Sequence, residues 1–362
     1  MHHLTRDEAR RIAVRAQLLD ADRPGDVVEV AEQIGSIKID PTATIAPAEQ
    51  AIPWSRIGWS YEPGQLKKAV EDDRLIFEHA GQFRPASHLP LMAARLRARE
   101  LRPATVEYLE ANRDFRADIV ARLRAEGPLQ ASDIPDTSVV RRSNEGGWYS
   151  SNEVPRMLEL LEAIGEVAIV ARTGPSGRQR VWDLTERAWP KDLPVYDADE
   201  AEELLQARRL QALGIARRKV NWSNVGDAGD AASVEGSAWK WRVDPDAIAA
   251  LSDDPGGRVA IMNPYDRMLF DRPRLKELFD FDYTVEQFKP KNQRIYGYFT
   301  YPILVGDRFV GQLDAALDKK KENLVVTAVH EMTDLDPEER EMVDAEIDDL
   351  AQWLGVPVVR AR

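Results

Sequence analysis

Residues 152–184 read NEVPRMLELLEAIGEVAIVARTGPSGRQRVWDL, and this stretch decides the fold. Asn152 can cap a helix over residues 152–164, in which apolar residues recur at helical spacing and form one face. Two runs rich in β-branched residues, 167–172 and 179–184, follow and are separated by a loop of Gly, Pro and Ser. The pattern predicts a helix followed by a β-hairpin.

The preceding stretch adds further helices in front of this pair of elements. Residues 116–135 read RADIVARLRAEGPLQASDIP, which predicts a helix, a Gly-Pro turn and a second short helix opening near Ser132. Three helices followed by a β-hairpin is the winged-helix order. The recognition helix would be 152–164, and the wing would be residues 173–178.

The N-terminal part predicts a comparable set of elements. A capping-box pattern opens a helix over 6–20, a second helix covers 27–34, and the alternating residues 37–40 predict a short strand. A further helix is expected over 63–77. We interpret residues 1–110 as a first winged-helix module.

The remainder of the chain changes character near Pro264. A helix over 199–214 and a strand over 239–243 are expected before it, and strands over 301–305 and 308–312 after it. A strand at 324–330 and a helix near 338–354 close the chain.

The predicted fold class is α+β, with tandem winged-helix modules followed by a small C-terminal β-barrel-like domain. Its boundaries are module 1 over 1–110, module 2 over 111–190, module 3 over 191–254, and the β-rich domain with its terminal helix over 255–362.

Composition excludes several classes of protein. The chain has no cysteine, which excludes disulfides, thiolate zinc sites and a cysteine nucleophile. Its five histidines show no zinc-site spacing apart from the adjacent pair near the N-terminus, so we expect no metal and no cofactor. No apolar run approaches the ~20 residues that span a bilayer. A cytoplasmic protein without membrane contact is therefore expected, and we expect it to be a monomer.

The net charge of −13 is unfavourable for a nucleic-acid binder, yet its distribution is uneven. Residues 331–350 hold ten acidic residues and one arginine, so this segment alone accounts for −9. Basic surfaces are therefore possible elsewhere, although each cluster could equally be an ordinary solvated one. The candidate clusters are Arg141 with Arg142, Arg178 with Arg180, the run 217–219, and Lys319 with Lys320 and Lys321.

Four stretches, read in order, carry a family resemblance. They are IKIDPTATIAPAEQAIPWSRIG at 37–58, RLIFEH at 74–79, residues 146–187, and residues 263–314. Together they resemble the AlkZ-like and YcaQ-like family of winged-helix DNA glycosylases. The resemblance implies three winged-helix modules and a small β-barrel arranged as a clamp around duplex DNA. It also implies a DNA-repair hydrolase that excises alkylated or bulky-adducted purines by cleaving their N-glycosidic bond.

In that family the chemistry is placed on a Gln-x-Gln or Gln-x-Asp motif, and the matching positions here are Lys38, Ile39 and Asp40. Asp40 fits one form of the motif, whereas Lys38 departs from it. The sequence Pro-Ala-Glu-Gln at 47–50 also replaces a basic-aromatic stretch of the best-studied members.

Residues two apart in a strand face the same side, so Lys38 and Asp40 could address one pocket. Asp40 could stabilise a developing oxocarbenium sugar and position a water. Lys38 could be an ion-pair partner of Asp40, a donor to water or phosphate, or an amine that attacks the sugar carbon and gives lyase activity. Alternatively, the pair is an exposed salt bridge on an edge strand.

Additional contacts to DNA phosphates are expected from Arg56, just after the motif, and from Arg294. The competing hypothesis is a non-catalytic winged-helix protein with a regulatory or structural role, which would bind duplex DNA without base release. A lesser alternative is that the modules bind protein, which the acidic balance permits.

Overall fold

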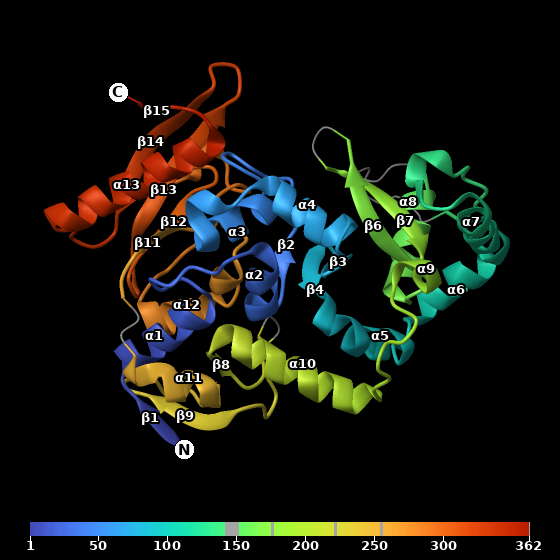
Figure 1. Cartoon of the computed structure of the whole chain (residues 1–362), viewed down its shortest axis with the longest axis horizontal. Coiled ribbons are helices and arrows are strands. Elements are labelled where there is room, and N and C mark those ends of the chain that lie inside the picture. The colour runs from blue at the N-terminus through green and yellow to red at the C-terminus, as the bar shows by residue number, and fades with distance from the viewer. Residues whose placement is uncertain (142–151, 175–176, 221–222, 254–255, 362) are drawn as a thin grey trace. The chain divides into compact units, whose positions relative to one another are not determined.

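The computed structural model describes residues 1–141, 152–174, 177–220, 223–253 and 256–361 (Figure 1). The chain forms two compact units. Unit 1 comprises Met1–Ala69, Gln82–Pro85 and Glu203–Arg362, and unit 2 comprises Val70–Gly81 and Ala86–Glu202. Each unit mixes helices and strands, so the predicted combination of both is confirmed. The division into four successive modules stays a prediction.

Two helices of unit 1 lead to the motif strand. Helix α1 (Arg6–Ala16) begins with the predicted capping box and ends before residue 20, because Leu18 takes a left-handed φ of 54°. Helix α2 (Val27–Ile34) has the predicted bounds and stops at Gly35, which has a φ of 73°. Strand β2 (Ile37–Lys38) follows directly.

Helix α3 (Ala48–Ile57) comes after the motif and was not predicted. The predicted helix over 63–77 is wrong in its last part, since α4 covers only Pro63–Glu71. A positive φ at Arg74 breaks the helical path, and the apolar residues beyond it form strand β3 (Ile76–His79).

Four strands of unit 1 form a small sheet in the order β1-β9-β10-β8. Their bounds are His2–Leu4, Asp230–Val234, Trp241–Val243 and Ile215–Arg217 respectively. Strand β1 pairs with β9 in parallel, and the other pairs are antiparallel. The predicted strand near 239–243 is thus confirmed as β10, whereas the pairing of the N-terminus with residues 230–234 was not foreseen.

The C-terminal strands form an open sheet in the order β11-β12-β13-β14-β15. Their bounds are Val259–Ile261, Tyr301–Val305, Arg308–Asp318, Asn323–Glu331 and Val358–Arg360. The expected barrel-like closure is wrong, because β11 and β15 lie at opposite edges and do not pair within the described part of the chain. The long hairpin of β13 and β14 instead extends the sheet, and α13 (Pro337–Leu354) follows it.

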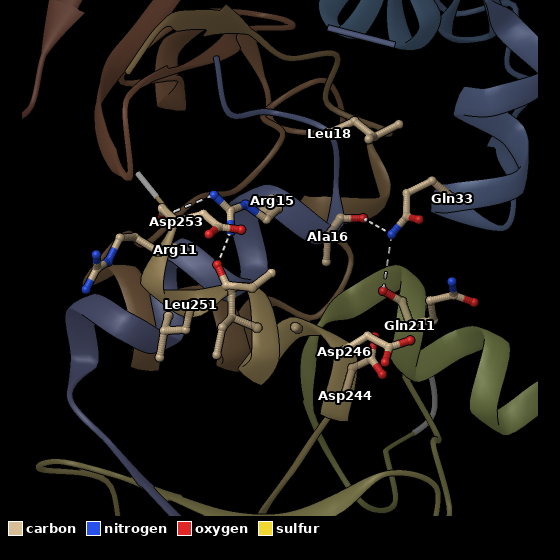
Figure 2. A pocket seen from close by; sticks show the side chains of 13 residues that line it. Arg11, Arg15, Ala16, Leu18, Gln33, Gln211, Asp244, Asp246, Leu251 and Asp253 are labelled. Carbon is tan, nitrogen blue, oxygen red and sulfur yellow. Dashed lines mark hydrogen bonds between the residues drawn. The ribbon is translucent and has the colours of Figure 1, made fainter. Parts of the chain in front are cut away.

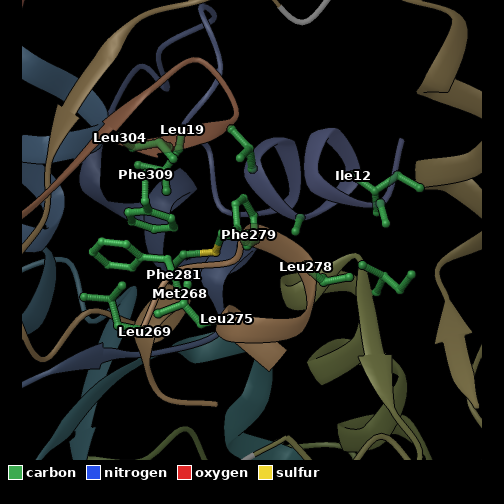
Figure 3. Packing of buried hydrophobic residues seen from close by; sticks show 14 of the residues in the cluster. Ile12, Leu19, Met268, Leu269, Leu275, Leu278, Phe279, Phe281, Leu304 and Phe309 are labelled. Atoms are coloured by element: carbon green, nitrogen blue, oxygen red, sulfur yellow. The ribbon is translucent and has the colours of Figure 1, made fainter. Parts of the chain in front are cut away.

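Unit 1 also contains α12 (Arg272–Phe279), and its core gathers residues from distant segments (Figure 3). Ile12 of α1 and Phe279 of α12 belong to the same buried cluster. Phe281 stacks on Phe309 of β13 with ring centroids 4.5 Å apart. This packing binds the N-terminal helix to the C-terminal sheet.

Unit 2 contains residues 152–184, for which a helix and a β-hairpin are predicted. Its helices are α5 (Leu89–Arg97), α6 (Pro103–Ala111), α7 (Arg113–Glu126), α8 (Val154–Ala163) and α9 (Thr185–Ala188). Its strands β3, β6 (Val167–Thr173), β7 (Gln179–Leu184) and β5 (Leu129–Gln130) lie side by side in this order, and each neighbouring pair is antiparallel. The predicted helix and hairpin are confirmed.

Helix α10 (Ala198–Leu213) confirms the helix expected over 199–214, and strand β4 (Gln82–Pro85) pairs with β2. Helix α11 covers Pro245–Ala249. The 3-10 helices are η1 (Gly58–Ser60), η2 (Ala86–His88), η3 (Ala131–Asp133), η4 (Ala250–Ser252), η5 (Arg267–Leu269) and η6 (Lys291–Gln293). Of the helices in the described residues, none is long and apolar enough to cross a membrane.

Candidate active site around Lys38 and Asp40

The predicted alternation around the motif is confirmed at its apolar positions. Ile37 and Ile39 are 0% and 7% exposed, whereas Lys38 and Asp40 are half-buried. Strand β2 ends at Lys38, however, so Asp40 lies just beyond the strand and not within it. The carboxylate therefore stands at the start of a loop.

Hydrogen bonds fix the backbone and the side chain of Asp40. Its Oδ1 accepts a hydrogen bond from the backbone N–H of Thr42 at 2.9 Å, and its own N–H donates to Glu49 Oε2 at 3.2 Å. The first contact is an Asx turn, which uses one of the two carboxylate oxygens. The side chain is thus held in a defined orientation at the end of β2.

The amine of Lys38 lies close to the same peptide. Lys38 Nζ donates to the carbonyl oxygen of Ile39 at 2.9 Å. The carbonyl belongs to the peptide that joins Ile39 to Asp40, so the cationic group is placed beside the backbone of the carboxylate residue.

Glu49 is a second carboxylate at this site, and the sequence analysis did not single it out. It lies in the first turn of α3, where a negative charge is favoured by the helix dipole. The signal available in the sequence was the pair Pro41 and Pro47, which bracket a short loop and return the chain toward the motif. Glu49 then caps the backbone of Asp40 across that loop.

Helix α3 is anchored in the interior of unit 1 by aromatic side chains. Trp54 stacks on Trp353 of α13 with centroids 5.5 Å apart, and Trp353 Nε1 donates to the Tyr61 carbonyl at 3.0 Å. The Tyr61 hydroxyl donates to Gln50 Oε1 at 2.7 Å. Burial, aided by the charge of Glu49, raises the pKa of Tyr61 well above its usual value, so this hydroxyl remains a donor.

The loop that follows Asp40 is held by the C-terminal sheet. The backbone N–H of Leu317 donates to the Thr44 carbonyl at 2.7 Å, and the Ile45 N–H donates to the Tyr301 hydroxyl at 3.2 Å. Strands β12 and β13 therefore support the loop between Asp40 and Glu49. The site is built from two ends of the sequence that meet within unit 1.

Arg56 was expected to contact a DNA phosphate, and the structure corrects this expectation. The side chain is completely buried and forms a two-pronged ion pair with Asp266, in which the Nη2–Oδ1 distance is 2.9 Å. Its Nε donates to the Gln17 carbonyl, and its Nη1 donates to the Ser55 hydroxyl. No face of this guanidinium is left toward solvent for a phosphate.

Three of the remaining predicted phosphate contacts lie in unit 2. Arg141 is exposed and stands 3.7 Å from Asp136. Arg178 is exposed after the β6–β7 loop, and Arg180 is half-buried with Glu159 at 2.7 Å and the ring of Trp182 beneath its guanidinium. Arg142 lies outside the described residues.

The other predicted contacts lie in unit 1. Arg294 lies over the ring of Tyr298 at 4.9 Å and donates to the Lys289 carbonyl. Lys319 and Lys320 are exposed at the turn between β13 and β14. All three side chains are on the surface of the unit that carries the motif.

A separate cavity of about 250 Å³ lies in unit 1, and Figure 2 shows the side chains around it. Arg15 donates to the Ala250 carbonyl, and Gln33 donates to the Ala16 carbonyl at 3.0 Å. Burial raises the pKa of Asp244 in its wall. The motif residues do not line this cavity, and the polar side chains that bridge it connect helices to neighbouring segments.

The chain is a member of a DNA glycosylase family. A family model described as DNA glycosylase AlkZ-like matches residues 31–353, which include both Lys38 and Asp40. The family is therefore the AlkZ-like one, and the resemblance drawn from the sequence is confirmed. Among solved structures, the fold is similar to that of the Streptomyces sahachiroi DNA glycosylase AlkZ, with a TM-score of 0.59 and 14% identity over the full length of both chains.

Proposed function

We propose that this protein is a DNA glycosylase that binds duplex DNA and hydrolyses the N-glycosidic bond of alkylated or bulky-adducted purines. The product would be an abasic site. Membership of the AlkZ-like family supports the reaction. The observation that carries the assignment of the site is the oriented carboxylate of Asp40 at the end of β2, at the acidic position of the family motif.

Cleavage of this N-glycosidic bond needs little help from a general acid, because an alkylated purine is already a cationic leaving group. It requires an anion near the developing oxocarbenium sugar and a positioned water. Asp40 supplies the anion, and the Thr42 N–H holds its side chain in place. Glu49, beside the backbone of Asp40, is a second acceptor that could orient the attacking water.

Lys38 is assigned the role of a cation beside Asp40 that can hold a water or a phosphate. Its hydrogen bond to the Ile39 carbonyl holds the Nζ atom next to the backbone of Asp40. If Lys38 instead attacked the sugar carbon, sodium borohydride would trap a covalent DNA adduct, and Lys38→Ala would eliminate it.

Unit 2 is proposed to be a winged-helix module that binds the DNA duplex. The order of α7, β5, η3, α8 and the β6–β7 hairpin supports this, as does the pairing of β5 with β7. Helix α8 would be the recognition helix, and Arg178 in the wing would contact phosphates, together with Arg141 and Arg180. The further modules over 1–110 and 191–254, monomeric action and a cytoplasmic location are part of the same proposal.

The direct test is base release from a panel of duplexes that carry alkylated or bulky-adducted purines. The wild-type protein is expected to release free base, and Asp40→Asn is expected to abolish release while DNA binding is retained. Duplex binding without release from any alkylated substrate would overturn the proposal.

The second candidate function is duplex binding without catalysis. It is favoured by one observation, namely that the Asp40 side chain closes an Asx turn, which is a purely structural task. This candidate predicts binding that weakens steeply with salt and no base release.

A further inference from the structure

Residues 286–298, EQFKPKNQRIYGY, form a loop of unit 1 that exposes large apolar side chains. Phe288 is 88% exposed, Ile295 is 71% exposed and Tyr298 is 44% exposed. We call this segment the basic-aromatic loop, because Lys289, Lys291 and Arg294 lie between Phe288 and Ile295 in its sequence. Isolated exposed apolar residues are common, but three within eleven positions that also hold three cations require an explanation.

A buried carboxylate holds the basic-aromatic loop in one conformation. Glu286 is 3% exposed, and its Oε2 accepts hydrogen bonds from the backbone N–H groups of Ile295 and Tyr296, both at 2.8 Å. Its Oε1 accepts a hydrogen bond from Lys289 Nζ at 2.8 Å. Burial opposes ionisation, but these hydrogen bonds outweigh it and lower the pKa of Glu286 to about 2. Glu286 therefore stays ionised and keeps these hydrogen bonds to the loop throughout the physiological pH range.

The far end of the loop is fixed against the C-terminal sheet. His330 of β14 lies with its Nε2 at 2.7 Å from the Tyr296 carbonyl, and the two rings meet edge to face. Gly297 has a φ of 145°, and a Cβ there would come within 2.7 Å of the Asp314 carboxyl group. This backbone conformation favours glycine at the point where the loop approaches β13.

The charge of the loop favours an anionic partner. The segment carries three cations and one carboxylate, although the chain as a whole has a net charge of −13. The Arg294 guanidinium lies 4.9 Å from the centre of the Tyr298 ring, which keeps a positive charge next to an exposed aromatic face. A partner that offers anions around an apolar, stackable interior fits this surface, and duplex DNA has that structure.

We propose that the basic-aromatic loop is a DNA wedge, in which Phe288 and Ile295 enter a base step while Lys291 and Arg294 contact the flanking phosphates. Insertion of apolar side chains unstacks the duplex and lowers the cost of displacing a nucleotide toward a site. This inference rests on the proposed function only in taking DNA as the ligand. It concerns a surface distinct from the Lys38 and Asp40 motif.

The test uses the full chain and two 2-aminopurine duplexes, one undamaged and one with a tetrahydrofuran abasic analogue opposite the 2-aminopurine. Unstacking of 2-aminopurine raises its fluorescence, and anisotropy of an end-labelled duplex gives Kd. Wild-type protein is expected to raise the fluorescence of at least the abasic duplex. The double variant F288S/I295S is expected to lose that rise and to weaken Kd by about tenfold.

Trp59→Ser is the matched control, because Trp59 is an exposed aromatic residue of unit 1 outside the loop, at 82% exposure. It should leave both signals unchanged, and both variants should melt like the wild type since they alter exposed side chains. A double variant with wild-type fluorescence and Kd would overturn the wedge. Binding of both proteins to anionic lipid vesicles is measured in parallel. If the double variant lost binding to the vesicles but kept its binding to DNA, the loop would be a lipid-binding surface and the wedge would also be overturned. Absence of base release with the fluorescence rise intact would instead count against the glycosylase proposal alone.

Discussion

Arg56 and Asp266 form a fully buried ion pair between segments 210 residues apart in the sequence. A buried guanidinium is tolerated only when its donors are satisfied, and here Asp266, Gln17 and Ser55 accept them. The pair links α3 to the segment that precedes α12. Its role is to fix the helix that carries Glu49, which explains why a basic residue beside the motif does not reach the surface.

Asp266→Asn is expected to destabilise the protein strongly, because the charge of Arg56 would remain in the interior without a counter-charge. Loss of one partner of a buried pair costs about 3–5 kcal/mol in the free energy of unfolding. Urea denaturation followed by tryptophan fluorescence measures this cost. Asp282→Asn is the control, since Asp282 pairs with Lys276 at the surface and should contribute less than about 1 kcal/mol. Equal effects of the two substitutions would contradict a structural role for Arg56.

Glu162 of α8 gives the stability of unit 2 a dependence on pH. Burial raises the pKa of its carboxyl from 4.5 to about 7, with His79 Nδ1 3.5 Å away. The folded state therefore keeps Glu162 protonated where the unfolded chain has already ionised it. The contribution of Glu162 to the free energy of unfolding should be most favourable below pH 4.5. It should become less favourable as the pH rises toward 7.

Glu162→Gln is expected to remove this decline, because the amide oxygen can still accept the Ala80 N–H and does not titrate. The variant should match the wild type at low pH and exceed it by up to about 3 kcal/mol above pH 7. Urea unfolding across this pH range tests the expectation. Parallel curves for the two proteins would show that Glu162 titrates normally.

At the scale of elements, helix α2 sets the position of the motif strand. Asp26 caps its N-terminus, with Oδ1 accepting the N–H groups of Val28 and Glu29 at 2.8 and 2.9 Å. Gly35 ends the helix in the left-handed conformation, and β2 begins two residues later. Asp26 and Gly35 therefore set the two ends of α2, and so the position of Lys38 and Asp40 relative to this helix.

Asp26→Ala should cost about 1 kcal/mol of stability, because two backbone donors at the helix start would lose their acceptor. Asp22→Ala, an exposed substitution in the preceding loop, should have little effect. Chemical denaturation of both variants provides the measurement. A cost for Asp22→Ala as large as that for Asp26→Ala would mean that net charge and not capping is responsible.

The elements that the sequence predicted best are those determined locally. Helix α2 has clear start and stop residues, and the hairpin of β6 and β7 has a turn between two apolar runs. The pairing of β1 with β9 could not be predicted, because two short strands distant in sequence carry no local signal of their partnership. That the C-terminal sheet is open could not be predicted either. Closure into a barrel depends on whether the two edge strands pair with each other, and the pattern of residues within each strand does not determine this.

In the candidate site, too, some residues could be predicted from local sequence and others could not. Lys38 and Asp40 could be proposed from the motif, since i and i+2 spacing is local. Glu49 comes to Asp40 only through the loop between two prolines, and Arg56 turns inward only because Asp266 arrives from 210 residues away. Their contacts are properties of the folded chain.

At the scale of the whole molecule, the acidic charge opposes the proposed DNA binding. Residues 331–350 hold −9 of the total of −13, and most of these side chains lie on the exposed side of α13 or just before it. A field of this sign repels phosphates over roughly one Debye length. The basic surfaces must therefore act against a negative background, which should make duplex affinity unusually sensitive to charge removal.

Neutralising three exposed acids of α13, with Glu338→Gln, Glu341→Gln and Asp348→Asn together, is expected to tighten duplex binding. The gain should be several-fold near roughly 50 mM salt and should vanish near roughly 500 mM, where screening shortens the range of repulsion. Fluorescence anisotropy at both salt concentrations measures it. A gain that persists at high salt would indicate a direct contact in place of a long-range field.

The parallel pairing of β1 with β9 has a consequence for how the protein is made. His3 and Ser233 of these strands are 230 residues apart, so at about 5–20 residues per second β1 emerges from the ribosome roughly ten to fifty seconds before its partner. Most of unit 2 is one continuous segment, 86–202, and should fold during that interval. Limited proteolysis of ribosome-stalled nascent chains truncated beyond residue 202 should find unit 2 protected and the N-terminal 69 residues cleavable. The N-terminal helices of unit 1 would then lack their C-terminal packing partners until translation is nearly finished.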